Sequence, residues 1–278
     1  AVQFYVEIAP TLVNVNIPTC YYAEGSMETG EMLLLLEDVS NSIPSGVFFG
    51  SGNPNNWAIT EKLPELCEGN PNAIETTIKA FELFAHMHGQ YWMDNTLIEK
   101  TWLRASDWRR GENEKSWKEA QAMQSSNWSN IKKQIGNGTA TIEWDSHLVA
   151  CLDVSFQKAS EENAFTTYSE RMSSNTFTLV QGDCHPHNLL WNKEDRSLHV
   201  IDFEMIGVGP PGQELGQFII SHMIPSVRRE CENTILQAYY DELQMILKGK
   251  GMENNNYTME TLKSEYINGG IGRWAWFI

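Results

Sequence analysis

A short polar segment, Gln181-Gly182-Asp183-Cys184-His185-Pro186-His187-Asn188, carries side chains suited to phosphoryl transfer. Such chemistry needs one carboxylate to orient an attacking hydroxyl and accept its proton, and an amide and a second carboxylate to hold magnesium against the phosphates. Asp183 and Asn188 have the Asp-x-x-x-x-Asn spacing of a phosphoryl-transfer loop, and an Asp-Phe pair, Asp202-Phe203, follows at the expected place. Each part alone is a weak signal, but the combination is specific.

The elements around this segment are predicted to be short strands. Residues 177–180 form a strand before it, and residues 189–201 form a hairpin after it. Upstream, residues 20–36 are predicted to form another hairpin whose second strand, 32–36, is buried. Helices dominate from residue 74, and the helical stretch 214–247 is interrupted at Pro225. The sequence thus predicts a small β-rich part followed by a larger, mostly helical part.

Composition restricts the class of partner and the compartment. The net charge of -16, from 36 acidic and 20 basic side chains, repels nucleic acids and anionic membranes, so neither is expected as a partner. The five cysteines include no Cys-x-x-Cys pair, which argues against a zinc ribbon or a disulfide framework and favours a reducing compartment. The longest purely apolar run, residues 32–36, cannot span a bilayer, and no signal peptide is visible. A cytoplasmic protein is therefore expected.

Several motifs resemble those of the aminoglycoside phosphotransferase and choline kinase superfamily. Residues 181–188 resemble its His-Gly-Asp-x-His-x-x-Asn loop, and residues 201–204, Ile-Asp-Phe-Glu, resemble its metal-binding motif. Residues 32–39 are similar to its adenine-binding strand and hinge, and residues 84–88 to a helix end common there. Glu214-Leu215-Gly216 lies where members often carry Asp-Leu-Ala.

The resemblance implies an α+β, two-lobed, protein-kinase-like fold with a truncated β-rich N-lobe and a mostly helical C-lobe. Residues 1–38 would be the remainder of the N-terminal lobe, a helix and a β-hairpin leading to the hinge. Residues 39–278 would be the helical C-terminal lobe with the catalytic loop and the metal-binding motif.

The resemblance also implies a reaction, the transfer of the γ-phosphoryl group of ATP to a hydroxyl of a small molecule, with Mg²⁺ as cofactor. Asp183 would be the catalytic base, and Asn188 and Asp202 the magnesium ligands. Residues Glu37, Asp38 and Val39 would bind the nucleotide through backbone hydrogen bonds to adenine. His185 would stabilise the loop or line the substrate cleft, and Glu204 would support metal or substrate or accept a hydrogen bond behind them. The acceptor stays open, because this architecture serves aminoglycosides, amino alcohols, sugars and steroid-like alcohols.

Two departures from the superfamily pattern bear on activity. Gln181 replaces the leading histidine, and its amide can still donate a hydrogen bond. The first basic residue is Lys62, and no glycine-rich loop precedes the hinge, whereas kinases place a lysine on the phosphates. We therefore expect the sequence to lack the first strands of the fold and to be an incomplete catalyst.

Two other functions compete with the kinase interpretation. The missing lysine is compatible with a catalytically silent nucleotide-binding relative. The pair His185 and His187 beside Asp183 could instead belong to a zinc-dependent hydrolase, but only His199 and His222 follow, without ligand-like surroundings. His86 and His88 are expected to be structural. Tryptophans 102, 108, 117 and 128 are expected to pack helices rather than to line a substrate pocket.

Overall fold

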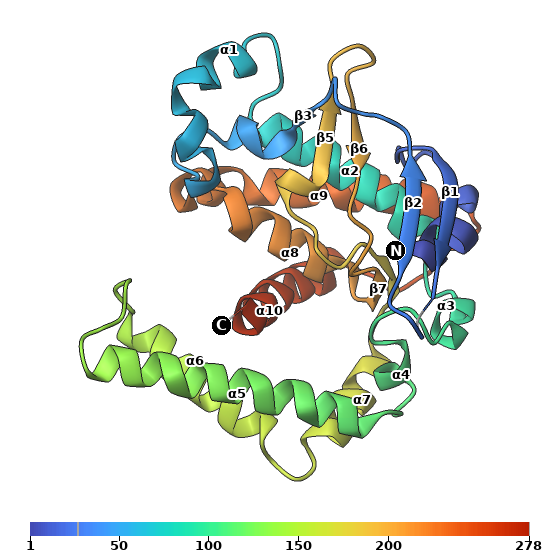
Figure 1. The fold of residues 1–278 in the computed structure, drawn as a ribbon. Helices are drawn as coiled ribbons and strands as arrows, with labels where there is room; N and C mark the ends of the chain where they lie inside the picture. Colours follow the sequence, from blue (N-terminus) through green and yellow to red (C-terminus); the bar gives the residue numbers. More distant parts are fainter. Residues whose placement is uncertain (27, 278) are drawn as a thin grey trace.

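The candidate site is framed by three small antiparallel sheets set against a bundle of helices. The computed structural model describes the chain apart from Met27 and Ile278, with side chains as far as Gly269. Its strands are β1 (Cys20–Gly25), β2 (Met32–Leu36), β3 (Ile43–Pro44), β4 (Thr178–Val180), β5 (Leu189–Asn192), β6 (Ser197–Val200) and β7 (Gly207–Gly209). Its helices are α1 (Leu63–Cys67), α2 (Ala73–Gln90), α3 (Asn95–Glu99), α4 (Ser106–Arg109), α5 (Glu114–Gly136), α6 (Ser146–Ala159), α7 (Ala164–Ser174), α8 (Pro211–His222), α9 (Pro225–Gly249) and α10 (Met259–Phe277). The predicted α+β class, with a small β-rich part and a larger helical part, is confirmed (Figure 1).

The sheets hold the ends of the polar segment in place. Strand β4 leads into it and pairs antiparallel with β7, and β5 leads out of it and pairs antiparallel with β6. Strand β3 adds a third member beside β5, and β1 pairs with β2 in a separate hairpin. Because β6 and β7 flank residues 201–206, the two pairings bring that segment back to residues 181–188.

Helices α2, α8, α9 and α10 form the layer beneath these sheets, α2 packed along α9 and α8 along α10 (Figure 1). Helix α2 begins with a capping box, in which Asn72 accepts from the N–H of Glu75 and Glu75 accepts from that of Asn72. Its apolar face buries Phe81 and Phe84 completely. The predicted interruption at Pro225 is confirmed, since α8 ends at His222 and α9 begins at Pro225.

The first residues pack directly on the Asp-Phe segment. A short π-helix, Phe4–Ile8, buries Phe4 and Ile8, and the Phe4 ring stacks on that of Phe203 with centroids 3.8 Å apart. Phe203 lies between Asp202 and Glu204, so this stack fixes the backbone from which both carboxylates project. The division of the chain into an N-terminal lobe, residues 1–38, and a C-terminal lobe, residues 39–278, stays a prediction.

The prediction that strand β2 is buried was wrong. The side chains of Met32, Leu33 and Leu35 are 61 %, 60 % and 56 % exposed, while Leu34 and Leu36 pack against the core. The unbroken apolar run indicated burial on both faces. In a two-stranded hairpin, however, alternate side chains point to opposite faces, and here the core covers one face only.

Helices α5, α6 and α7 form an excursion away from the core (Figure 1). Aromatic side chains hold it together: Trp117 packs against Phe165 at 5.7 Å between centroids, and Trp128 against Trp144 at 5.6 Å. Trp117 and Trp128 are buried, as expected for residues that pack helices. Within the described part of the chain, no helix is long and apolar enough to cross a membrane.

A half-buried carboxylate, Glu265, joins α10 to the start of α8 and should make stability depend on pH. Glu265 Oε2 accepts from Tyr257 Oη at 2.7 Å and from the Gly212 N–H at 3.3 Å, and burial raises the pKa of Glu265 to about 7. The folded state therefore prefers the neutral acid, so this contribution is fully present below about pH 4.5 and is lost as pH rises through 7. We expect Glu265→Gln, which keeps an acceptor oxygen, to raise the free energy of unfolding at pH 8 by about 1–3 kcal/mol.

Urea unfolding of both proteins at pH 5 and pH 8 checks this expectation. The gain should nearly vanish at pH 5, where Glu265 is protonated in the folded state. An equal gain at both pH values would mean that the carboxylate is not the titrating group.

Candidate active site

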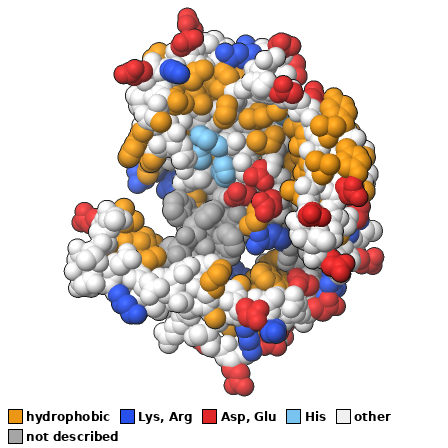
Figure 2. Space-filling view, viewed as in Figure 1, with side chains coloured by type: hydrophobic (Ala, Val, Ile, Leu, Met, Phe, Trp, Pro, Cys, Tyr) orange, Lys and Arg blue, Asp and Glu red, His pale blue; other side chains and the backbone are white. Residues whose placement is uncertain are grey.

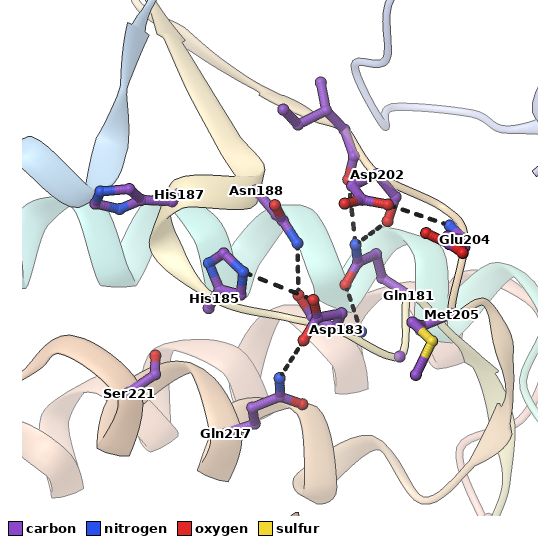
Figure 3. A network of polar contacts seen from close by, with 12 residues as sticks. Gln181, Asp183, His185, His187, Asn188, Asp202, Glu204, Met205, Gln217 and Ser221 are labelled. Carbon is purple, nitrogen blue, oxygen red and sulfur yellow. Dashed lines mark hydrogen bonds and ion pairs between the residues drawn. The ribbon is translucent and has the colours of Figure 1, made fainter. Parts of the chain in front are cut away.

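Asp183 is held by hydrogen bonds on three sides. Its Oδ1 accepts from Gln217 Nε2 at 2.9 Å, its N–H donates to Gln181 Oε1 at 2.9 Å, and its carbonyl accepts from Asn188 Nδ2 at 2.9 Å (Figure 3). The Asp183 side chain is 26 % exposed, and His185 Nε2 lies 3.7 Å from Oδ2. The carboxylate is thus fixed in direction and partly exposed to solvent.

Asn188 and Asp202 are neighbours because their backbones are joined. The N–H of Ile201 donates to the carbonyl of Asn188 at 2.9 Å, at the edge of the β5–β6 hairpin. Asn188 is buried and its amide nitrogen donates to the loop, so its amide oxygen is the atom that could hold a metal ion. Asp202 has a φ of 58°, a left-handed conformation that is costly for a non-glycine residue, and its side chain is exposed. Amide and carboxylate oxygens are the hard donors that magnesium prefers, so these two residues fit a magnesium–nucleotide complex.

Glu204 and His185, the residues predicted to support the site, lie in different surroundings. Glu204 is exposed and follows Asp202, and its N–H lies 3.4 Å from Asp202 Oδ1. His185 lies beside Asp183 and stacks on His222, with rings 5.7 Å apart and nearly parallel. Figure 3 shows Glu204 beyond Asp202 and His185 on the other side of Asp183. The roles of both stay predictions.

Gln181, which replaces the superfamily's histidine, ties the two motifs together. Its Nε2 donates to the carbonyls of Ile201, at 3.1 Å, and of Asp202, and its Oε1 accepts from the N–H of Asp183. The side chain is almost fully buried. An amide can donate and accept at once, which suits this position.

Side chains of helix α8 hold the loop of residues 181–188. The sequence did not predict these contacts. Glu214 Oε1 accepts from the Gly182 N–H at 2.8 Å, Gln217 bonds Asp183, and His222 contacts His187 and His185. Gln217 is three residues after Glu214 and His222 eight residues after it, so all three side chains lie on the side of the helix that faces the loop. The available signal was a set of polar residues within an otherwise apolar, buried helix.

Behind Glu214 lies a fully buried polar chain. Its Oε2 is 2.8 Å from His88 Nε2, and His88 Nδ1 is 2.8 Å from Tyr239 Oη. The carbonyl of His88 accepts from Thr178 Oγ1 at 2.7 Å. The expectation that His88 is structural is confirmed, because both ring nitrogens are occupied within the core.

Three histidines, His185, His187 and His222, meet beside the loop, a cluster that the sequence did not predict. His222 Nε2 lies 3.1 Å from His187 Nδ1 and 3.3 Å from Asn55 Nδ2, and the rings of His187 and His222 are 4.8 Å apart. Burial lowers the pKa of His222 to about 3 and lowers that of His187, so both stay neutral at neutral pH. Nevertheless, the described residues include no group of three His, Cys, Asp or Glu side chains arranged to hold a metal ion.

Residues 37–39, the predicted adenine-binding segment, directly follow strand β2. The N–H of Glu37 donates to the Thr19 carbonyl at 2.8 Å, and its carboxylate accepts from the N–H and hydroxyl of Thr19, which holds the pKa of Glu37 below its usual range. Asp38 Oδ1 accepts from the Ser40 N–H at 2.9 Å, and the Val39 carbonyl accepts from the Ser42 N–H. The side chains of Glu37 and Asp38 are thus used to shape the turn, so any nucleotide contact falls to the backbone.

Comparison with known proteins assigns a family. The model of the DUF1679 family, described as "uncharacterized oxidoreductase dhs-27", matches residues 111–268. The chain belongs to the DUF1679 family. The matched part includes the polar segment, Asp202 and helices α8 and α9. No curated protein matches this chain.

Among solved structures, this DUF1679 protein is similar to a candidate aminoglycoside phosphotransferase from Ralstonia eutropha JMP134. The two share 12 % identity and a TM-score of 0.47, over 99 % of this chain and 82 % of the other.

Proposed function

We propose that this DUF1679 protein transfers the γ-phosphoryl group of ATP to a hydroxyl of a small molecule. The observation that carries the proposal is the joint placement of Asp183, Asn188 and Asp202 by the β5–β6 hairpin and helix α8. These are the carboxylate, amide and second carboxylate that phosphoryl transfer requires. The superfamily that the motifs resemble supports ATP and Mg²⁺ as the cofactors.

In the proposed reaction Asp183 orients the acceptor hydroxyl and takes its proton. The acceptor oxygen forms a bond to the γ-phosphorus, the bond from that phosphorus to the β–γ bridging oxygen breaks, and ADP leaves. Gln217 keeps the carboxylate directed at the acceptor, and Asn188 holds the backbone carbonyl of Asp183. Asn188 and Asp202 would hold magnesium, which neutralises charge on the phosphates when bound.

Replacing the proposed ligands tests the nucleotide site. We expect Asp202→Ala and Asn188→Ala to weaken binding of magnesium–ATP by at least about tenfold, because each removes an oxygen from the metal. Calorimetric titration with ATP in excess Mg²⁺ measures this effect. A parallel titration with chelator should show little difference between Asp202→Ala and the parent, since Asp202 is proposed to act through the metal.

Glu194→Ala serves as the matched control. Glu194 is an exposed carboxylate in the turn of the same hairpin and should leave affinity within about twofold. Unchanged magnesium–ATP affinity in Asp202→Ala would remove Asp202 from the metal site. One equivalent of zinc per chain by metal analysis would favour the hydrolase instead.

The family description raises oxidoreductase activity as a second candidate, and one sequence pattern fits it. Residues 207–212, Gly-Val-Gly-Pro-Pro-Gly, match the Gly-x-Gly-x-x-Gly pattern of dinucleotide-binding turns. That turn works in a parallel βαβ unit, with N–H groups at the helix start facing a pyrophosphate.

The structure of this segment differs from a dinucleotide-binding turn. Strand β7 is antiparallel to β4, two prolines remove N–H groups, and the Gly212 N–H lies 3.3 Å from Glu265 Oε2. A Cβ at Gly212 would lie 2.5 Å from Glu265 Cβ, so this glycine permits the contact between α8 and α10. The pattern therefore does not support a dinucleotide site.

A further inference from the structure

The proposed reaction needs cationic side chains that neutralise charge on the phosphates. The structure brings a basic residue to the site from another part of the chain. We propose that Arg104, in the loop between α3 and α4, binds the γ-phosphoryl group of ATP during transfer. This inference rests on the proposed function and names a residue of the same site.

The backbone of Arg104 is held beside residues 201–206, which contain the proposed magnesium ligand Asp202 and are called the metal-binding segment below. Its N–H donates to the Ile206 carbonyl at 3.2 Å, and its carbonyl accepts from the Val208 N–H at 2.9 Å. It thus forms a parallel bridge to Gly207, the first residue of β7. A Cβ at Gly207 would lie 2.7 Å from the Arg104 carbonyl oxygen, so glycine is required for this approach. The following residue, Ala105, takes a left-handed φ of 62°, which turns the chain away at once into α4.

The side chain of Arg104 reaches the residues that join the two motifs. Its Nη1 contacts Met205 Sδ, and Met205 follows Asp202-Phe203-Glu204 directly. The Met205 carbonyl oxygen would lie 1.9 Å from a Cβ at Gly182, the residue before Asp183, so Met205 packs against the catalytic loop as well. Figure 3 shows Met205 beside Glu204, on the side of Asp183 opposite His185. Arg104 is therefore anchored where the loop and the metal-binding segment meet, and its side chain is exposed.

The negative charge around the site supports a phosphate-binding role for Arg104. The protein has a net charge of -16, and Asp183, Asp202 and Glu204 give the site a negative field that would repel ATP. On the face in Figure 2, carboxylates gather beside a basic side chain, next to histidines. A guanidinium stays charged at any working pH and can donate two parallel hydrogen bonds to phosphate oxygens.

Neighbouring basic residues make contacts away from residues 201–206. The Arg109 guanidinium is buried, bonds the Asn175 carbonyl at 2.7 Å and has a pKa lowered by burial to about 10. Arg110 pairs with Glu112, and Lys100 pairs with Glu7. Within the described side chains of this stretch, it is Arg104 whose guanidinium meets the metal-binding segment.

Nucleotide binding separates a γ-phosphoryl contact from other roles. We would measure, by calorimetry in excess Mg²⁺, the dissociation constants of ADP and of a non-hydrolysable β,γ-imido analogue of ATP. For Arg104→Ala we expect the analogue to bind about 10- to 100-fold more weakly, the usual effect of losing a hydrogen bond to a charged group. ADP affinity should stay within about threefold. Arg104→Lys should recover part of the analogue affinity, because it keeps the charge and loses the planar fork.

Arg171→Ala, which removes an exposed arginine from α7, is the matched control and should bind both nucleotides as the parent does. Equal binding of the analogue by Arg104→Ala and the parent would overturn the assignment and leave the proposed function standing. A parallel loss for ADP and the analogue would also overturn it, since the contact would not be with the γ-phosphoryl group. A parent protein that binds neither nucleotide would contradict the proposed function itself.

Discussion

Asp183→Asn should lower turnover by about 10²–10⁴-fold while leaving the affinity for magnesium–ATP nearly intact. The asparagine keeps an oxygen that can accept from Gln217 Nε2, so the loop should keep its conformation. What it loses is the ability to take a proton from the acceptor hydroxyl. Initial rates of ATP-dependent phosphorylation, with binding measured in parallel by calorimetry, separate the two effects.

A carboxylate elsewhere provides the comparison for Asp183. Asp241, exposed on helix α9, can be changed to asparagine in the same way and should leave turnover unaltered. If Asp183→Asn retained turnover within about threefold of the parent, Asp183 could not be the base.

The second large effect concerns stability. Glu214→Ala should lower the free energy of unfolding by about 3–5 kcal/mol, because it leaves both His88 and the Gly182 N–H without their buried partner. Glu214 and His88 are 3 % and 0 % exposed, so water cannot replace the missing oxygens without opening the core. Since domains are stable by only about 5–15 kcal/mol, much of the variant is expected to unfold at moderate temperature. Urea denaturation followed by circular dichroism measures the change.

Two companion variants show whether the buried hydrogen bonds cause this loss. Glu214→Gln keeps an acceptor for Gly182 and should be clearly more stable than Glu214→Ala. Glu230→Ala, at an exposed position of α9, should fall within about 0.5 kcal/mol of the parent. A loss of less than about 1 kcal/mol for Glu214→Ala would show that the buried chain contributes little.

Residues close together in sequence were the ones that sequence reasoning could place. Asp183 and Asn188 lie in one loop whose internal hydrogen bonds are local, so their spacing alone indicates their shared geometry. The sequence also predicted that Asp202 lies near the loop, because a predicted hairpin joins the two. Strands β5 and β6 indeed pair. The assignment of chemical roles to these residues stays a prediction.

The residues that the sequence did not reveal act across long separations. Gln217 reaches Asp183 and His222 reaches His187 only because α8 packs under the loop, a tertiary arrangement that no local pattern encodes. Arg104 is brought to Gly207 by a single bridge between distant segments. The exposure of β2 was likewise missed, because an apolar run does not say whether one or both faces of a hairpin are covered.

The most direct test of the central claim follows the γ-phosphoryl group itself. The protein would be incubated with Mg²⁺, γ-³²P-labelled ATP and a panel of hydroxyl compounds that includes aminoglycosides, amino alcohols, sugars and steroid alcohols, and the products separated by chromatography. We predict that label appears on the hydroxyl of at least one acceptor with the parent protein and not with Asp183→Asn. Transfer of label to no acceptor, although the protein binds magnesium–ATP, would contradict the phosphotransferase proposal and favour a silent nucleotide-binding relative.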